Sequence, residues 1–428
     1  MDIYKIEGNR PLRGEVKISG SKNSCLPLMF ASLLTNDTFI LESVPNSRDI
    51  RTTLQLMPHL GKQGLWKSPG DLILQRIHDG SMGARAIPYR LVKQMRASVL
   101  AAGPMLARYG KAIVSMPGGC AIGLRPIDIH LEGFKAMGAA LKISRGNVCL
   151  SAKRGKLRAA NIKLPFQSVG ATENLILAAT LAKGTTRLSN CAKEPEIADM
   201  CNALNKMGAN IAGIGTSSVA ITGVTSLRGA IHKSIPDRIE TGTFAFFAAC
   251  TKGSLVRINT CNPAHLKTVW EYLQRAGVKL KFSKNSVEIR TSRNFRPKPV
   301  PASTGPYPQF PTDLQPLWIA FMSQASGNTR FKETIFESRF LHIAEMKRMG
   351  AQIYARGTHA DIKGIPQLSG AQVMAGDIRG GAGLMACALA AKGTTTISRI
   401  YHIDRGHEFL EGKLKSLGAK IERLRETI

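Results

Sequence analysis

Residues 206–214 read KMGANIAGI, and variants of this stretch occur six times along the chain. In each copy a glycine separates residues with helical apolar spacing from residues in which apolar and polar side chains alternate. This arrangement predicts a helix that ends at a left-handed glycine and is followed by a β-strand. The copies are HLGKQG, AMGAALKI, KMGANIAGI, RAGVKLKF, RMGAQIYA and SLGAKIER, around Gly61, Gly138, Gly208, Gly277, Gly350 and Gly418.

The regular spacing of these glycines predicts six structural repeats. Successive glycines lie 77, 70, 69, 73 and 68 residues apart. Upstream of most copies is a second, Ala-rich helix followed by a Thr-rich, strand-like run, as in ILAATLAKGTTRLSN at 176–190. Because that helix is apolar on nearly all sides, we expect it to lie inside, with the sheets outside it. The repeats therefore predict an inside-out α/β fold of two globes with three units each, and an open solenoid is the alternative.

Charge is the unusual feature of the composition. The 428 residues, enough for two or three domains, include 59 Lys and Arg against 29 Asp and Glu, a net charge of +30. Such an excess predicts an acidic partner: an anionic small substrate, a nucleic acid or a membrane surface. The basic residues are dispersed and aromatic residues make up only 6% of the chain. This pattern disfavours a stacking platform for nucleic acid, so we expect an anionic small substrate.

Localisation and metal binding are predicted from what the sequence lacks. The apolar runs are far shorter than the ~20 residues of a membrane span, and the N-terminal residues carry no apolar signal segment. The eight cysteines are dispersed without a CxxC pair, and the histidines match no zinc motif. We therefore expect a cytoplasmic protein with buried thiols, with no membrane association and no metal site.

Polar clusters occur where the buried helix of each repeat should begin. Helix N-termini have free N–H groups and partial positive charge, so six of them converging with basic side chains would attract anions. Ordinary helix capping with solvated charges is the alternative explanation for any single cluster. The clusters are Ser21-Lys22-Asn23, Arg96-Ala97-Ser98, Ser168-Val169-Gly170, Asp237-Arg238, Thr312-Asp313 and Asp377-Ile378-Arg379.

A lone thiol lies in the segment PGGCAIGLRP at 117–126. Three glycines and two bounding prolines are typical of an exposed loop that changes conformation. Cys120 precedes Arg125 by five residues, and a thiol near guanidinium groups is more acidic than a free cysteine. We therefore predict that Cys120 is functional rather than a buried apolar side chain.

Ten motifs together resemble the enolpyruvyl transferases, specifically those that act on a nucleotide sugar. The resemblance implies an inside-out α/β barrel of two domains with six βαβαββ repeats, three per domain. One domain is expected at 22–234 with the Cys120 loop, the other at 1–21 plus 235–428 with Asp313, Arg379 and Arg405, and the active site in the cleft between them. The motifs are GSKNS at 20–24, MRAS at 95–98, PGGCAIGLRP, SVGATEN at 168–174, EPEI at 194–197, PDRIETGTF at 236–244, FPTDLQ at 310–315, TIFESRF at 334–340, DIR at 377–379 and YHIDRGHE at 401–408.

The reaction that this resemblance implies is transfer of the enolpyruvyl group from phosphoenolpyruvate to the 3-hydroxyl of UDP-N-acetylglucosamine, with release of phosphate and no cofactor. It assigns catalysis to Lys22, Cys120, Asp313 and Arg405, with Asp313 as general base and Cys120 as acid or aid to product release. It also implies two sets of binding residues. The phosphoenolpyruvate set adds Arg96, Arg125, Arg339 and Arg379, and the remaining substrate contacts are Asn23, Ser168, Val169, Gly170, Ile335 and Phe336.

Two alternatives and one departure accompany the resemblance. The enolpyruvyl transferase of the shikimate pathway would share the fold, and a non-catalytic relative could bind acidic polymers through its basic surface. Where some family members carry a lysine that reaches the nucleotide, this chain has Phe166-Gln167. The oligomeric state is not predicted by the sequence.

Overall fold

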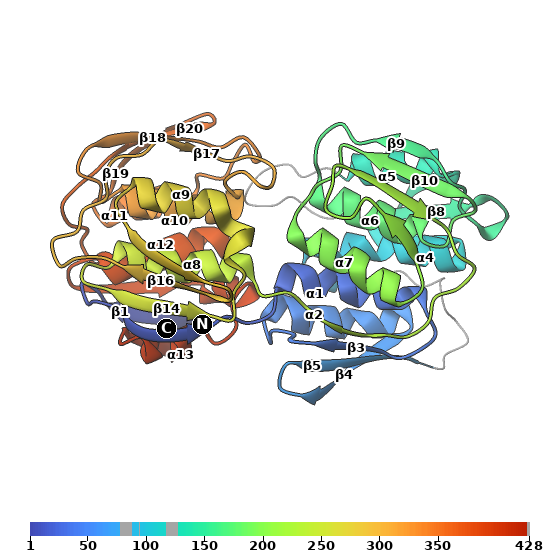
Figure 1. Cartoon of the computed structure of the whole chain (residues 1–428), viewed down its shortest axis with the longest axis horizontal. Coiled ribbons are helices and arrows are strands. Elements are labelled where there is room, and N and C mark those ends of the chain that lie inside the picture. Colours follow the sequence, from blue (N-terminus) through green and yellow to red (C-terminus); the bar gives the residue numbers. More distant parts are fainter. Residues whose placement is uncertain (78–87, 94, 117–126, 426–428) are drawn as a thin grey trace. The chain divides into compact units, whose positions relative to one another are not determined.

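The computed structural model describes residues 1–77, 88–93, 95–116 and 127–425, which divide between two compact units. We call residues 1–19 and 236–425 the terminal unit, and the described residues from 20 to 235 the central unit. Each unit has its own apolar core. Figure 1 shows the elements of each unit in the colours of the sequence.

In the described part of the chain, each unit contains three β-sheets. The strand orders in the terminal unit are β21-β22-β1-β23, β15-β16-β14-β2 and β17-β18-β20-β19, and those in the central unit are β11-β12-β10-β9, β13-β3-β5-β4 and β6-β8-β7. The strands of the terminal unit are β1 (Asp2–Glu7), β2 (Arg13–Lys17), β14 (Leu255–Asn259), β15 (Lys279–Ser283), β16 (Ser286–Arg290), β17 (Ala302–Ser303), β18 (Asn328–Lys332), β19 (Gln352–Arg356), β20 (His359–Lys363), β21 (Gln372–Met374), β22 (Thr394–Ser398) and β23 (Lys420–Arg425). Those of the central unit are β3 (Phe39–Glu42), β4 (Lys62–Ser68), β5 (Asp71–Arg76), β6 (Lys111–Ser115), β7 (Ala139–Ser144), β8 (Asn147–Ala152), β9 (Asn161–Lys163), β10 (Thr185–Ser189), β11 (Asn210–Ala212), β12 (Ser218–Thr222) and β13 (Ile231–Lys233).

The helices fall into a buried set and an outer set, as the sequence predicts. All thirteen residues of α8 are buried, and most of them carry small or apolar side chains, so the helix is apolar on nearly all sides. The buried set is α1 (Lys22–Ala31), α4 (Ala102–Tyr109), α6 (Val169–Ala179), α8 (Arg238–Cys250), α10 (Gln315–Met322) and α12 (Ile378–Ala390). The other helices are α2 (Arg48–Leu56), the short α3 (Tyr89–Val92), α5 (Asp128–Ala136), α7 (Pro195–Lys206), α9 (Lys267–Arg275), α11 (His342–Arg348) and α13 (Leu410–Ser416).

The segment from β9 to β12 shows one complete βαβαββ unit. Strands β9 and β10 pair in parallel, and the buried helix α6 connects them. After the outer helix α7, the hairpin β11–β12 returns to the sheet and β12 pairs antiparallel with β10. A parallel pair requires such a crossover, so the helix must lie on one face of the sheet.

All six repeat glycines adopt the left-handed conformation that their position predicts. Their φ angles lie between 85° and 101°. Five follow an α-helix directly or by one residue, whereas the segment before Gly61 ends in the 3₁₀ turn η2 (Met57–Leu60), which contains Pro58. Any residue with a Cβ would be strained there, so the glycine is required by the backbone rather than by packing.

Within the described residues, the chain passes from one unit to the other after residue 19 and again after residue 235. In each unit, one strand next to such a passage pairs with a strand that is distant in the sequence. Strand β2 pairs in parallel with β14, and β13 pairs in parallel with β3. The N-terminal strand β1 lies between β22 and β23 and pairs antiparallel with both. Asp2 is opposite Arg425, so the first and the last described strands of the chain lie side by side in this sheet (Figure 1).

Candidate active site

The predicted polar clusters lie at helix N-termini, and several of them cap those helices. Ser21 and Ser168 accept hydrogen bonds from backbone N–H groups of α1 and α6. Asp237 and Asp377 each accept two such bonds, at the starts of α8 and α12. The capping explanation is therefore correct for these four side chains. It leaves their neighbours, which include Lys22 and Arg379, to be explained separately.

In the terminal unit, Asp313 is held between two arginines. It lies in the 3₁₀ turn η6 (Thr312–Leu314) that leads into α10. Its Oδ1 accepts a hydrogen bond of 2.9 Å from Arg339 Nη2, and its Oδ2 accepts one of 3.0 Å from Arg379 Nη2. The two arginine side chains are only 4% and 9% exposed. The structure thus brings Asp313 together with both arginines.

The environment keeps the Asp313 carboxylate ionised. Burial acts to raise its pKa, but the charges of Arg379 and Arg339, the hydrogen bond from Arg379 and the charge of Arg238 hold the pKa well below its usual range. Arg238 and Arg379 belong to the first turns of α8 and α12, while Asp313 precedes α10. The N-termini of α8 and α12 therefore contribute cations around the carboxylate that precedes α10.

The segment that follows β18 carries Ile335, Phe336 and Arg339. Ile335 is 37% exposed, and Phe336 is half-buried with the Arg339 guanidinium 5.2 Å from its ring centroid. Arg339 Nη1 also donates a 3.3 Å hydrogen bond to Thr312 Oγ1. An apolar surface thus lies beside the cations that bind Asp313, an arrangement suited to a ligand with apolar and anionic parts.

Glu333 is a buried residue that the sequence analysis did not identify. Its side chain is 1% exposed, and its carboxylate accepts hydrogen bonds from the side chains of Thr304 and Thr312 and from the backbone N–H groups of Ile335 and Phe336. It directly precedes the motif TIFESRF, so the sequence alone shows that it lies next to predicted site residues. Nothing in a single sequence, however, shows which distant hydroxyls it meets.

Arg405 ends the 3₁₀ turn η7 (Ile400–Arg405), which packs against α12. Its neighbour Asp404 accepts two hydrogen bonds from Arg423, of 3.1 and 2.6 Å. A Cβ on Gly406 would lie 3.5 Å from Arg379 Nη1, so this turn ends beside the arginine that binds Asp313. The bidentate pair with Arg423 fixes the backbone that carries Arg405.

In the central unit, Lys22 occupies the first turn of α1 and is almost completely buried. Its Nζ lies 3.1 Å from Asp49 Oδ2, and the two side chains are 7% and 6% exposed. A buried ammonium group needs such a partner to remain charged. Asn23, the next residue, is half-buried. Asp49 was missed by the sequence analysis, because its pairing with Lys22 depends on the packing of α2 on α1.

The start of α6 forms another part of the central unit's predicted site. Ser168 Oγ accepts from the Ala171 N–H, and Val169 and Gly170 are half-buried in the first turn. A Cβ on Gly170 would lie 3.4 Å from His130 Cε1, so the imidazole packs closely against the helix start. His130 Nδ1 is 3.0 Å from Asn174 Nδ2, which fixes the orientation of the ring.

Three predicted residues cannot be placed with the others. Cys120 and Arg125 lie outside the described residues, and Arg96 is described only as the first residue of the 3₁₀ segment η3 (Arg96–Ala101). The η3 segment packs against α1 and α6.

Other cysteines are placed, and most are buried as predicted. Burial raises the pKa of Cys191 and Cys261 to about 11 and that of Cys201 and Cys387 to about 12. Those four thiols are therefore protonated at neutral pH, which makes them poor nucleophiles.

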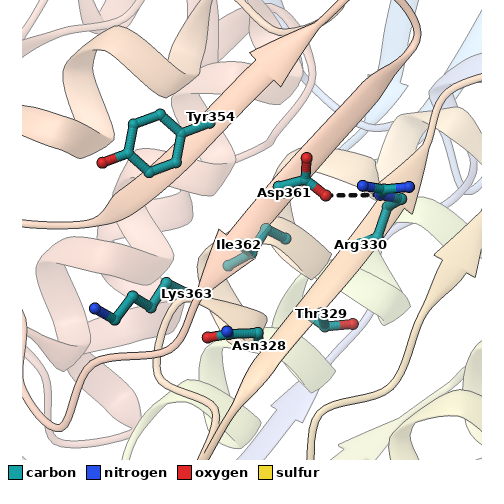
Figure 2. Close-up of a pocket in the computed structure, with 7 residues that line it drawn as sticks. All are labelled: Asn328, Thr329, Arg330, Tyr354, Asp361, Ile362 and Lys363. Atoms are coloured by element: carbon teal, nitrogen blue, oxygen red, sulfur yellow. Dashed lines mark hydrogen bonds and ion pairs between the residues drawn. The ribbon is translucent and has the colours of Figure 1, made fainter.

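A surface pocket lies at the opposite end of β18 from Glu333 (Figure 2). It is an open depression on strands β18, β19 and β20, and none of its seven lining residues is a predicted site residue. Arg330 and Asp361 pair across it at 2.6 Å, and Tyr354 is 66% exposed (Figure 2). Because Arg330 and Asp361 are exposed and pair with each other, and no predicted site residue lines the pocket, we do not assign the chemistry to it.

Among the described residues, no group of three or more His, Cys, Asp or Glu side chains is arranged to hold a metal ion. None of the described helices combines the length and the apolar character needed to cross a bilayer.

Comparison with known families and proteins gives matches over almost the whole chain. A family model described as EPSP synthase (3-phosphoshikimate 1-carboxyvinyltransferase) matches residues 6–414. The UDP-N-acetylglucosamine 1-carboxyvinyltransferase of Endomicrobium trichonymphae is 45% identical over 98% of this chain and 99% of its own length. The protein of the same name from Rhodospirillum centenum is 46% identical over 100% of both chains.

Solved structures agree on the fold. The enolpyruvyl transferase NikO from Streptomyces tendae superposes with a TM-score of 0.88 at 23% identity, covering 99% of this chain and 98% of its own. An EPSP synthase from Acinetobacter baumannii gives a TM-score of 0.74 at 18% identity, covering 99% and 100%. These likenesses confirm the predicted fold class, a mixed α/β enolpyruvyl transferase fold.

Proposed function

The chain belongs to the family of 1-carboxyvinyl (enolpyruvyl) transferases, and on this premise we propose that it transfers the enolpyruvyl group of phosphoenolpyruvate to the 3-hydroxyl of UDP-N-acetylglucosamine. Phosphate is the second product. The reaction is the first committed step of peptidoglycan synthesis. The proposal takes the two sets of predicted residues, one in each unit, to serve one reaction.

The observation that carries the choice of acceptor is sequence identity over the full length. Four relatives named for UDP-N-acetylglucosamine are 45–47% identical to this chain. The compared EPSP synthase structure, whose acceptor would be 3-phosphoshikimate, is only 18% identical. The shared fold is compatible with either acceptor, so the difference in identity decides between them.

The proposed chemistry is an addition followed by an elimination. The sugar oxygen attacks C2 of phosphoenolpyruvate while C3 takes up a proton, which gives a tetrahedral ketal. Loss of a proton from C3 and of phosphate from C2 then restores the double bond, now in the enol ether. The enzyme must therefore supply a proton acceptor at the hydroxyl, a proton donor at C3 and cations for the carboxylate and phosphate.

Asp313 is the proposed proton acceptor, and its low pKa limits how it can act. An ionised carboxylate paired with two arginines is a weak base towards a free hydroxyl. The hydroxyl oxygen becomes strongly acidic only as its bond to C2 forms. Asp313 would therefore orient the hydroxyl in the ground state and take its proton late, during bond formation.

Cations from both units are the proposed ligands of the anionic groups. Lys22, Arg125 and Arg405 are assigned to phosphoenolpyruvate, with Arg96, Arg339 and Arg379 nearby. Buried or preorganised cations stabilise developing negative charge better than solvent does, because they need not reorganise. The ion pairs of Lys22 with Asp49 and of Asp404 with Arg423 support this role, since they hold the cation-bearing turns in place.

The nucleotide sugar is assigned to the start of α6 and to the apolar residues after β18. The N–H groups at a helix N-terminus suit a phosphate or carbonyl oxygen. Asn23, Ser168, Val169, Gly170, Ile335 and Phe336 form this set. Half-burial or exposure of these residues in the free protein is consistent with their contacting a ligand.

The acceptor is tested directly by phosphate release. Purified protein is mixed with phosphoenolpyruvate and either UDP-N-acetylglucosamine or 3-phosphoshikimate. We expect release of phosphate with the nucleotide sugar alone. Release with 3-phosphoshikimate alone would replace the proposed acceptor, and salt-sensitive binding to DNA without turnover of either would favour a non-catalytic basic protein.

The role of Cys120 is tested by Cys120→Ser. We expect turnover to be abolished or greatly slowed, because serine is a far weaker acid than an activated thiol. Sensitivity to fosfomycin should be lost, because the resemblance implies that fosfomycin alkylates this cysteine. Cys149→Ser is the matched control, since Cys149 is a partly exposed thiol on β8. Unchanged kinetics of Cys120→Ser would remove Cys120 from the mechanism.

A further inference from the structure

Glu333 joins two parts of the proposed acceptor site. Its Oε2 accepts a 2.8 Å hydrogen bond from Thr312 Oγ1, the residue before Asp313. Its Oε1 accepts bonds of 2.8 and 3.2 Å from the backbone N–H groups of Ile335 and Phe336. One carboxylate therefore contacts both the turn that carries the base and the segment assigned to the nucleotide sugar.

The connection continues through Thr312 to the base itself. Thr312 Oγ1 donates to Glu333 and accepts from Arg339 Nη1, and Arg339 Nη2 binds Asp313. Each member of this chain is fixed by the next. A shift of Glu333 would move the arginine that orients Asp313 as well as the apolar residues 335 and 336.

A second hydroxyl anchors the carboxylate from the other side. Thr304 Oγ1 donates to Glu333 Oε1 at 2.8 Å and accepts from the Thr334 N–H at 2.7 Å. The side chain of Glu333 is 1% exposed, so water cannot replace these partners. Hydrogen bonds to a buried charged acceptor are stronger than neutral ones, and losing them is costly.

We propose that Glu333 is a positioning residue that sets the Asp313 base against the bound nucleotide sugar. The inference rests on the proposed function. Glu333 touches no substrate in this proposal and acts through Thr312 and through the backbone of residues 335 and 336. Four donors converge on its two oxygens, and a glutamine could present only one oxygen to them.

The test is Glu333→Gln, with steady-state kinetics for each substrate separately. We expect kcat to fall about 10–100-fold, because even a small misplacement of the reacting groups slows the reaction strongly. The KM for UDP-N-acetylglucosamine should rise about tenfold for the loss of charge-assisted contacts, while the KM for phosphoenolpyruvate changes less than about twofold. Glu422→Gln, on the exposed face of β23, is the control and should leave all three constants unchanged.

Variants of Thr312 provide a second route that does not depend on the folding of Glu333→Gln. Thr312→Val removes the hydroxyl and should reproduce the loss in kcat, whereas Thr312→Ser, which keeps the hydroxyl, should restore part of it. The double variant Glu333→Gln/Thr312→Val should be little worse than Glu333→Gln alone, since both break one chain of contacts.

Different failures have different meanings in this experiment. Wild-type protein that releases no phosphate with UDP-N-acetylglucosamine would overturn the proposed function and this inference together. If the wild type turns over UDP-N-acetylglucosamine, three results would overturn the inference alone. They are equal effects of Glu333→Gln on both KM values, an unchanged kcat of Glu333→Gln, and strictly additive effects of the two substitutions.

Discussion

At Asp313, burial and two arginines act in opposite directions on one carboxylate, and the arginines prevail. The result is a side chain that stays ionised throughout the neutral range and has little tendency to take a proton. Such a group orients a hydroxyl well but removes its proton only when bond formation makes that proton acidic. Its low pKa also means that the acid limb of the pH–rate profile must come from another group.

Replacing Asp313 by asparagine tests this account. We expect kcat to fall about 10²–10⁴-fold, the usual contribution of a general base. Stability should also fall, by about 3 kcal/mol, because Arg339 and Arg379 would be left buried without their anion. Urea unfolding and turnover measure the two effects.

The pH dependence of that stability has a definite sign. The pKa of Asp313 is lower in the folded chain than its ordinary value of 3.8, so the stabilisation is fully present above pH 3.8 and is lost as the pH falls further. The difference in free energy of unfolding between the wild type and Asp313→Asn should therefore be constant from about pH 5 to 9. A gap that grows or shrinks across that range would contradict the assignment.

Side chains differ in how far the sequence could place them. The helix-start clusters placed Asp313 with Arg379 because both lie where repeated buried helices begin. Pairs such as Lys22 with Asp49 and Glu333 with Thr312 could not be predicted, since they depend on how separate elements pack. The left-handed glycines, by contrast, were predictable because their signal is local.

At the scale of single elements, the backbone conformation at the end of a helix determines which residue is required there. Gly350, after α11, has a φ of 88° and no neighbour within 4 Å of an added Cβ. Gly376, also in the terminal unit, has equal space but no left-handed φ. Steric crowding is thus absent at both positions, and only backbone strain distinguishes them.

This pair gives a matched stability test. We expect Gly350→Ala to destabilise the protein by about 1–2 kcal/mol, the cost of a left-handed non-glycine residue. Gly376→Ala should have little effect or be slightly stabilising. Chemical unfolding measures both, and equal effects would show that strain at the helix end is not what requires glycine.

Two cationic side chains bind the backbone carbonyl groups that follow α1 in the central unit. Arg108 Nη1 donates to the carbonyl oxygens of Leu33 and Thr35, and Lys62 Nζ donates to that of Asp37 at 2.6 Å. Burial, followed by the charge of Arg108, lowers the pKa of Lys62 to about 8. The folded state therefore bears a cost for keeping this buried ammonium charged at neutral pH.

Lys62→Met should relieve that cost. We expect the variant to be more stable by about 2 kcal/mol at pH 7. The free energy of unfolding of the wild type should rise towards that of the variant as the pH increases from 8 towards 10.5. The reason is that Lys62 loses its proton at a lower pH in the folded protein than in the unfolded chain. Urea unfolding at pH 7 and pH 9.5 checks both statements, and a less stable Lys62→Met at pH 7 would contradict them.

At the scale of the whole molecule, the two units differ in how the chain builds them. The described part of the central unit comes from one stretch, 20–235, whereas the terminal unit needs both ends of the chain. Strand β1 fills the interior of a sheet, with Tyr4 and Ile6 completely buried. Local periodicity predicted the strands and helices, but only their pairing reveals this dependence.

A circular permutation tests the dependence. We expect residues 236–428, joined through a short glycine-serine linker to residues 1–19, to fold cooperatively, because Asp2 and Arg425 are opposite each other in the sheet. Residues 236–428 alone should remain largely unfolded, since β22 and β23 would lack the strand between them. Circular dichroism and thermal melts distinguish the two, and a stable fold of the shorter fragment would contradict the expectation.

The position of β1 also has a consequence for biosynthesis. It is translated long before its partner β22, which begins at Thr394. At ribosomal rates of about 5–20 residues per second, this strand must wait roughly 20–80 s before its neighbours emerge. During that interval Tyr4 and Ile6, which are completely buried in the folded protein, lack their partner strands, whereas the central unit has all its residues available about midway through translation.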